Sequence, residues 1–201
     1  GNPEAILEIM RLKPDSATPY LDIYNSIVGE DQEQWQKTAL ALYNEKLYDQ
    51  GAALLDYYTE KYGFTTLSEL YLRLLYLAGR YGDYITRFEQ LNAYRSENAS
   101  SPIEISVMGY LLLCSSLLKQ HRFDDLDQLS SVILSNPPSI PDMEDIMKFK
   151  GIQLTLQQMR ILAQNEAYTL IDDPDFDPVR QIFPFSTPDG NPFDNETATE
   201  K

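Results

Sequence analysis

The chain has 201 residues, enough for one domain with a substantial core, and its 43% apolar content is typical of a folded protein. Its net charge of −15 argues against nucleic acid and anionic membranes as partners, because both require clustered Lys and Arg. A basic, polar or peptide partner suits this charge better. The one cysteine rules out an internal disulfide, and no apolar run approaches the roughly 18 residues of a membrane-spanning helix.

The chain opens with signals for two short helices. Asn2 and Pro3 stand as a cap and a first-turn proline, and the pattern that follows predicts a helix running to Lys13. A further helix is expected over about residues 18–28. Because the chain begins at Gly1 rather than Met, it is also compatible with a processed or trimmed product.

Three turns in the middle of the chain can be laid on one another. Residues 47–50, 80–83 and 122–125 each hold an aromatic ring flanked by polar residues, and each lies between two helical patterns. The ring-to-ring steps are 33 and 42 residues, from position 48 to 81 and from 81 to 123. A helix–turn–helix unit that recurs at this period predicts a helical repeat protein, in which no unit buries its apolar face alone.

Each turn is expected to join a first helix to a second helix. The first unit ends at Gly63, a plausible helix stop, and the third unit ends at Pro137 and Pro138, which cannot continue a helix. A loop rich in Ser and Asn, residues 96–102, separates the second unit from the third. The predicted apolar helix patterns cover residues 35–43, 52–63, 65–79, 85–91, 103–120 and 126–133.

This layout resembles the tetratricopeptide-repeat (TPR) family over roughly residues 31–138. In that family a large ring begins the first helix, a small residue follows four positions later, and an aromatic follows the turn. The second unit matches at Gly79 and Tyr81, but Ser68 and Leu72 replace the ring and the small residue. The matching residues elsewhere are Trp35, Ala39, Tyr48 and Gly51 in the first unit, Tyr110, Cys114 and Phe123 in the third, and Pro138.

We therefore expect an all-α, TPR-like α-solenoid of about three and a half helix–turn–helix repeats over residues 1–171. Its last helix, from residue 142 to about 171, would cap the C-terminal end. Residues 172–201 carry 5 of the 12 prolines and 8 acidic against 2 basic residues, which predicts an extended acidic tail. We expect Trp35 to be buried against Tyr48 and against a close contact between Ala39 and Gly51.

The sequence offers little for catalysis. His121 is the one histidine and stands in a turn, about 10 Å along the chain from Cys114 if the helix continues, too far for a thiolate–imidazole pair. There are too few Cys and His residues for a zinc site, and no Gly-rich phosphate loop occurs. We expect no catalytic residue, no bound metal and no cofactor.

The resemblance implies that one side of each first helix lines the inner face of the superhelix. Aromatic, apolar and mixed-charge residues on such a face suit a bound peptide or helix. The chain holds 14 tyrosines, and core packing and interface anchoring are both open to them. The inner-face residues are expected to be Gln36, Leu40 and Tyr43, then Glu69, Arg73 and Tyr76, then Met108, Leu111 and Ser115.

The function expected from this reading is a non-catalytic protein–protein interaction adaptor or scaffold subunit in the cytoplasm. The rival is an exported, sugar-capturing helical lipoprotein, which a signal sequence upstream of Gly1 would favour. In the tail, Asn191, Pro192 and Phe193 form a tripeptide similar to those read by Eps15-homology domains. The apolar stretch 179–185 is expected to dock back on the helical body.

Overall fold

A computed structural model describes residues 3–12, 17–103, 105–135 and 143–166, and within these ranges every regular element is a helix. The all-α prediction is confirmed for this part of the chain. The helices are α1 (Pro3–Leu12), α2 (Ala17–Val28), α3 (Gln32–Asn44), α4 (Tyr48–Tyr62), α5 (Ser68–Leu77), α6 (Tyr81–Glu97), α7 (Val107–Lys119), α8 (Phe123–Ser135) and α9 (Met143–Gln164).

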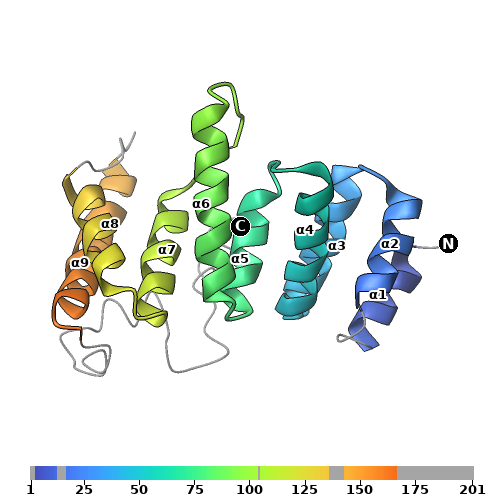
Figure 1. The fold of residues 1–201 in the computed structure, drawn as a ribbon, viewed down its shortest axis with the longest axis horizontal. Coiled ribbons are helices and arrows are strands. Elements are labelled where there is room, and N and C mark those ends of the chain that lie inside the picture. The colour runs from blue at the N-terminus through green and yellow to red at the C-terminus, as the bar shows by residue number, and fades with distance from the viewer. Residues whose placement is uncertain (1–2, 13–16, 104, 136–142, 167–201) are drawn as a thin grey trace. The chain divides into compact units, whose positions relative to one another are not determined.

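The chain divides into two compact units, residues 1–109 and 110–201, with the division inside α7. In residues 1–109, α1 packs against α2, α3 against α4, α4 against α5 and α5 against α6 (Figure 1). In the same residues α2 also contacts α4. In the second unit α8 packs along α9.

The three overlaid turns have the same backbone geometry, as the sequence predicts. Lys46, Gly79 and His121 all have positive φ, at 60°, 73° and 56°. The amide after each of them donates a 2.9 Å hydrogen bond to a leucine carbonyl five positions back, on Leu42, Leu75 and Leu117 respectively. This is the Schellman arrangement, which satisfies the last carbonyls of a helix and reverses the chain.

The end of α9 has the beginning of the same turn. Glu166 has φ of 49°, and its amide donates to the carbonyl of Ala163 at 2.9 Å, as His121 does to Leu118. A buried leucine, Leu162, again stands four positions before the positive-φ residue. The expected helix to residue 171 is therefore too long, because the backbone leaves the helix after Gln164.

Trp35 is fully buried, as predicted, but its neighbours differ from the prediction. Its ring lies 4.8 Å from that of Tyr24, 6.0 Å from Tyr57 and 5.3 Å from Tyr58, and its indole N–H donates to the carbonyl of Gly29 at 2.8 Å. The prediction of Tyr48 as its neighbour was wrong, because α3 and α4 are antiparallel. Trp35 is far from the turn, so it meets the far end of α4.

Tyrosine hydroxyls tie neighbouring helices together in the first unit. Tyr57 donates to Asp22 and Tyr62 to Asn25, both at 2.6 Å, which joins α4 to α2. Tyr84 of α6 donates to the carbonyl of Gly109 in α7 at 2.8 Å. These rings combine apolar burial with one satisfied polar tip. Much of the tyrosine richness therefore serves packing between helices.

Gly51 permits a close approach between α4 and α5. A Cβ atom built there would lie 2.8 Å from a terminal methyl of Leu74, which is itself fully buried. The small residue predicted at position 51 is therefore needed for the contact with Leu74 of α5, and not for the expected contact with Ala39.

Candidate functional site

We use the name groove line for the residues ten and six positions before the positive-φ turn residue of each first helix, a set defined by register alone and described for each helix by itself. All of them come from the inner-face prediction, and their exposure falls along the chain. The groove line consists of Gln36 and Leu40 in α3, Glu69 and Arg73 in α5, and Leu111 and Ser115 in α7.

On α3 the groove line faces solvent. Gln36 is exposed and Leu40 is 40% exposed, which is high for an apolar residue in the middle of a helix. Tyr43 lies one turn further on, half-buried, with its ring edge-on to Tyr48 at 6.0 Å. This face of α3 presents an amide, an aliphatic and an aromatic group together.

On α5 the groove line is charged. Arg73 donates to Glu69 at 3.0 Å, with side chains 26% and 44% exposed, and the hydroxyl of Ser106 donates to the same carboxylate at 3.3 Å. The prediction that Tyr76 lies on an open inner face was wrong. Its side chain is 5% exposed, because the rings of Tyr81 and Tyr84 pack edge-on against it. It belongs to the packing between α5 and α6.

On α7 the groove-line residues are buried. Leu111 is 1% exposed and Ser115 is fully buried, so the expectation that these residues form a free surface was wrong. All eight residues from 111 to 118 are buried, a pattern expected of a helix that is covered on every face. Met108, which lies before this stretch, is half-buried.

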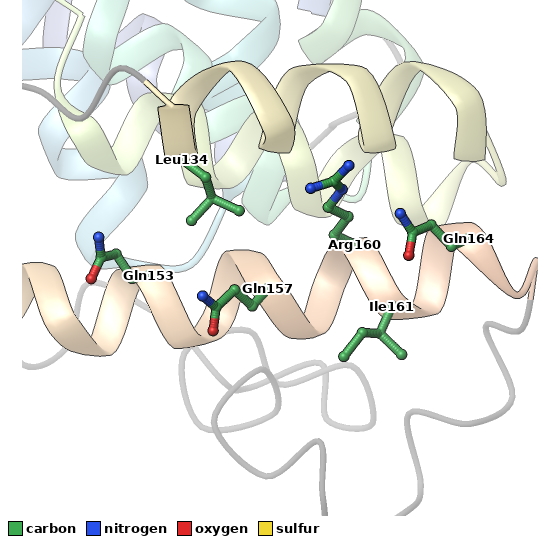
Figure 2. Close-up of a pocket in the computed structure, with 6 residues that line it drawn as sticks. All are labelled: Leu134, Gln153, Gln157, Arg160, Ile161 and Gln164. Carbon is green, nitrogen blue, oxygen red and sulfur yellow. The ribbon is translucent and has the colours of Figure 1, made fainter.

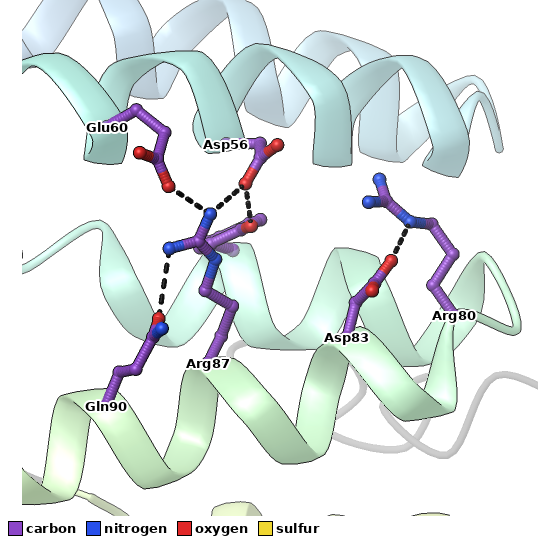
Figure 3. A network of polar contacts seen from close by, with 7 residues as sticks. Asp56, Glu60, Arg80, Asp83, Arg87 and Gln90 are labelled. Carbon is purple, nitrogen blue, oxygen red and sulfur yellow. Dashed lines mark hydrogen bonds and ion pairs between the residues drawn. The ribbon is translucent and has the colours of Figure 1, made fainter.

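A polar cluster between α4 and α6, in the first unit, was not foreseen from the sequence (Figure 3). Arg87 donates to Asp56 at 2.9 Å, to Gln90 at 3.0 Å and also to Glu60, while Arg80 donates to Asp83 at 2.7 Å. The cluster lines a surface pocket of about 280 Å³. No local pattern links residues 31 positions apart, so only the fold reveals this contact.

Tyr71 of α5 belongs to the same cluster and donates its hydroxyl proton to Asp56. Burial, and then this hydrogen bond, raise the pKa of Tyr71. Arg87 joins α6 to α4 through Asp56 and Glu60, whereas Arg80 and Asp83 pair within the start of α6.

A second, larger pocket of about 540 Å³ lies between α8 and α9 (Figure 2). Leu134 is directed from α8 toward α9, while Arg160 is directed from α9 toward α8 and donates to Asp127 at 2.6 Å. Three glutamines and the exposed side chain of Ile161 complete the lining. The glutamines are Gln153, Gln157 and Gln164.

Cys114 and His121 are the cysteine and the histidine that the sequence offers for nucleophilic or metal chemistry. Cys114 is fully buried, and burial raises the pKa of its thiol to about 12, so the nucleophilic thiolate is scarce at neutral pH. His121 is exposed in its turn, with its ring 5.6 Å from that of Phe123. Among the described residues, no group of three or more His, Cys, Asp or Glu side chains gathers as a metal site.

Asn191, Pro192 and Phe193 lie outside the described residues, as do residues 172–201 as a whole and the stretch 179–185. Among the described helices, none has the length and hydropathy needed to cross a membrane. Comparisons with protein-family models, with curated proteins and with solved structures found no match.

Proposed function

We propose that the chain is a TPR-like helical-repeat protein that works as a non-catalytic adaptor, binding a peptide or helix of another protein. The observation that carries the proposal is the groove line on α3 and α5. There an exposed amide, an exposed leucine and a half-exposed ion pair occupy matching register positions on the first helices of two successive helix–turn–helix repeats.

The repeated turn supports the repeat assignment. Three first helices end in the same hydrogen-bonded turn with a positive-φ residue, a leucine four positions before it and a ring two positions after it. α9 begins a fourth turn of this kind, and Tyr168 stands two residues after Glu166 in the sequence. On this view α9 is the first helix of a further helix–turn–helix repeat and not a cap.

The chemistry of the groove line suggests what its partner carries. Leu40 and Tyr43 offer apolar and aromatic surface, which suits side chains repeated on one face of a helix or on alternate positions of a strand. Arg73 and Glu69 would meet polar groups of either sign. The net charge of −15 would speed the approach of a basic partner.

An experiment on the full chain tests this proposal with two matched variants. Leu40 on the groove line and Ile23 on α2 are both exposed aliphatic residues in helices of the first unit. Proteins retained by the immobilised wild-type chain from an extract of its source organism are compared by mass spectrometry with those retained by Leu40→Asp and by Ile23→Asp.

We expect the retained amount of at least one protein to fall tenfold or more with Leu40→Asp and to stay unchanged with Ile23→Asp. One unpaired charge buried in the complex costs at least about 1.4 kcal/mol, which lowers the affinity tenfold. If both variants retain the same proteins as the wild type, the groove line is not the binding surface.

A further inference from the structure

The pocket between α8 and α9 is lined on one side by a single stripe of α9 (Figure 2). The α9 residues that line it follow each other at intervals of four, three, one and three positions, so they share one face of the helix over about three turns. Leu134 lines the pocket from α8. The residues of the stripe are Gln153, Gln157, Arg160, Ile161 and Gln164.

Two glutamine amides of this stripe have their hydrogen-bonding groups available. Within the described part of the chain, neither Gln153 nor Gln157 makes a hydrogen bond through its side chain. Gln153 is half-buried and Gln157 is exposed. Each amide carries one carbonyl acceptor and two N–H donors. The pocket therefore presents paired donors and acceptors to a ligand.

The other end of the stripe is held in place by α8. Asp127 accepts a hydrogen bond from Nε of Arg160 at 2.6 Å and another from the side-chain amide of Gln164 at 3.0 Å. The terminal Nη groups of Arg160 have no partner among the described residues. Because Asp127 balances the guanidinium charge, the pocket favours a neutral polar ligand over a charged one.

The spacing of the two free amides matches the repeat of an extended peptide. The four-residue step from Gln153 to Gln157 rises about 6 Å along the helix. In an extended chain the N–H and C=O of one residue point to the same side, and this orientation returns every second residue, after about 6.4–6.8 Å. Each glutamine amide can therefore pair with the N–H and C=O of one residue, and the second glutamine can repeat the pairing two residues on.

An extended segment fits the pocket better than a helix does. The main-chain N–H and C=O groups of a helix already pair with each other, so they would leave the glutamine amides without a use. The stripe from Gln153 to Gln164 is about 16.5 Å long, which is the length of about five extended residues. Ile161, which is 47% exposed, and Leu134 offer apolar contact to the side chains of such a segment.

We propose that the pocket between α8 and α9 binds an extended peptide through its main chain. Gln153 and Gln157 pair with alternate residues of the peptide, and Arg160 donates to a carbonyl further along. Side chains of the peptide are read weakly, because the pairing uses groups that nearly every residue carries. This site lies in the second compact unit, whereas α3 and α5 lie in the first, so it is independent of the groove-line proposal.

Parallel selections from a phage library of random 12-residue peptides test the site on the full chain. The three baits are the wild type, the double variant Gln153→Ala with Gln157→Ala, and Gln128→Ala. Gln128 is an exposed glutamine of α8 that does not line the pocket, so it is the matched control. Alanine favours the helix more than glutamine does, so both variants should fold.

We expect a class of peptides that is enriched on the wild type and on Gln128→Ala and lost on the double variant. By fluorescence anisotropy, a synthetic peptide of this class should bind the double variant at least tenfold more weakly than the wild type, because up to four hydrogen bonds are lost. The proposal is overturned if no peptide distinguishes the wild type from the double variant, or if Gln128→Ala loses the same peptides. Peptides bound by the groove line would be enriched on all three baits and would not alter this comparison.

Main-chain pairing is tested on the wild-type chain by replacing each amide of the synthetic peptide in turn with an ester, which removes one N–H donor. Affinity should fall about three- to tenfold at two positions that are two residues apart, and less than twofold at the residue between them. Losses at every position, at no position, or at positions three and four apart would overturn the proposal. These results do not depend on Leu40, so this proposal and the proposed function can fail separately.

Discussion

At the scale of single residues, Trp35 organises the core of the first unit. It contacts rings from α2 and α4 and donates its N–H to the carbonyl of Gly29, so one side chain links three helices and a turn. Its burial could be predicted from the TPR-like pattern. Its neighbours could not, because they depend on how the two helices of the hairpin run past each other.

Replacing Trp35 tests this packing. Trp35→Ala should lower the free energy of unfolding by about 3–5 kcal/mol, as for a large ring removed from a core. In double-mutant cycles, Trp35→Ala should couple to Tyr58→Ala by about 0.5–1.5 kcal/mol and to Tyr48→Ala by close to zero. Denaturant unfolding measures both; stronger coupling to Tyr48 would contradict the observed packing.

We predict that Lys119 makes the stability of the folded chain depend on pH. Burial lowers the pKa of its ammonium group to about 8, below its ordinary value of 10.5. Below pH 8 both folded and unfolded states carry the proton, so the cost of burying the charge is complete. Between pH 8 and 10.5 the folded state releases the proton while the unfolded state keeps it, so stability rises with pH, by at most about 1.4 kcal/mol per unit.

The measurable window is pH 7.5 to about 8.5, because above it the unfolded Cys114 thiol ionises while burial raises the pKa of the folded thiol to about 12, which makes stability fall with pH. The unfolded tyrosines titrate higher still, near pH 10. Tyr57 acts in the opposite direction above that pH: its hydrogen bond to Asp22 raises the pKa of the folded side chain to about 12, so its contribution is lost as pH rises. Lys119→Met should remove the rise and stabilise the chain at pH 7.5. An unchanged slope would mean that Lys119 is not the group responsible.

At the scale of the helix elements, the turn residues decide where each first helix ends. Gly79 has positive φ at no steric cost, whereas Lys46 adopts nearly the same angle with a side chain. The sequence overlay located these turns through their rings and missed the turn at Glu166. The same signals are present there, since Leu162 and Tyr168 stand four residues before and two residues after Glu166.

Exchanging glycine and non-glycine residues at these positions should have opposite effects. Gly79→Ala should lower the free energy of unfolding by about 1 kcal/mol, and Lys46→Gly should raise it by about 0.5–1 kcal/mol, after the larger unfolded-state entropy of glycine is subtracted. Thermal melts of both variants measure this. Effects of the same sign would show that backbone strain at the turns is not the controlling term.

At the scale of the whole molecule, sequence periodicity predicted the order of the helices in the described part of the chain, but it placed several helix ends wrongly, most of all the end of α9. Periodicity did not predict that Tyr76 and Leu111 are buried. Residues at one register position share a helix face, but exposure of that face depends on what other parts of the chain cover it. The Asp56–Arg87 contact needed the fold as well, because it joins α4 to α6, two helices that are not consecutive in the chain.

The groove line connects these scales. Its residues occupy equivalent positions because the turns repeat. Of the predicted inner-face residues on it, Gln36 and Leu40 on α3 are exposed, and Glu69 and Arg73 on α5 are half-exposed. Tyr43, Arg73 and Ser115 each take part in a further interaction, so none of them is a free group waiting for a ligand.

Site-specific photocrosslinking tests the central claim, that the groove line binds another protein, most directly. A benzophenone amino acid is placed in the full chain at Gln36, on the groove line, or at Thr86, a polar residue on α6 that is also exposed. We predict a crosslink from position 36 to a protein partner that excess unlabelled chain competes away, and no such crosslink from position 86. Crosslinks from 86 alone, or equal yields from both positions, would contradict the account.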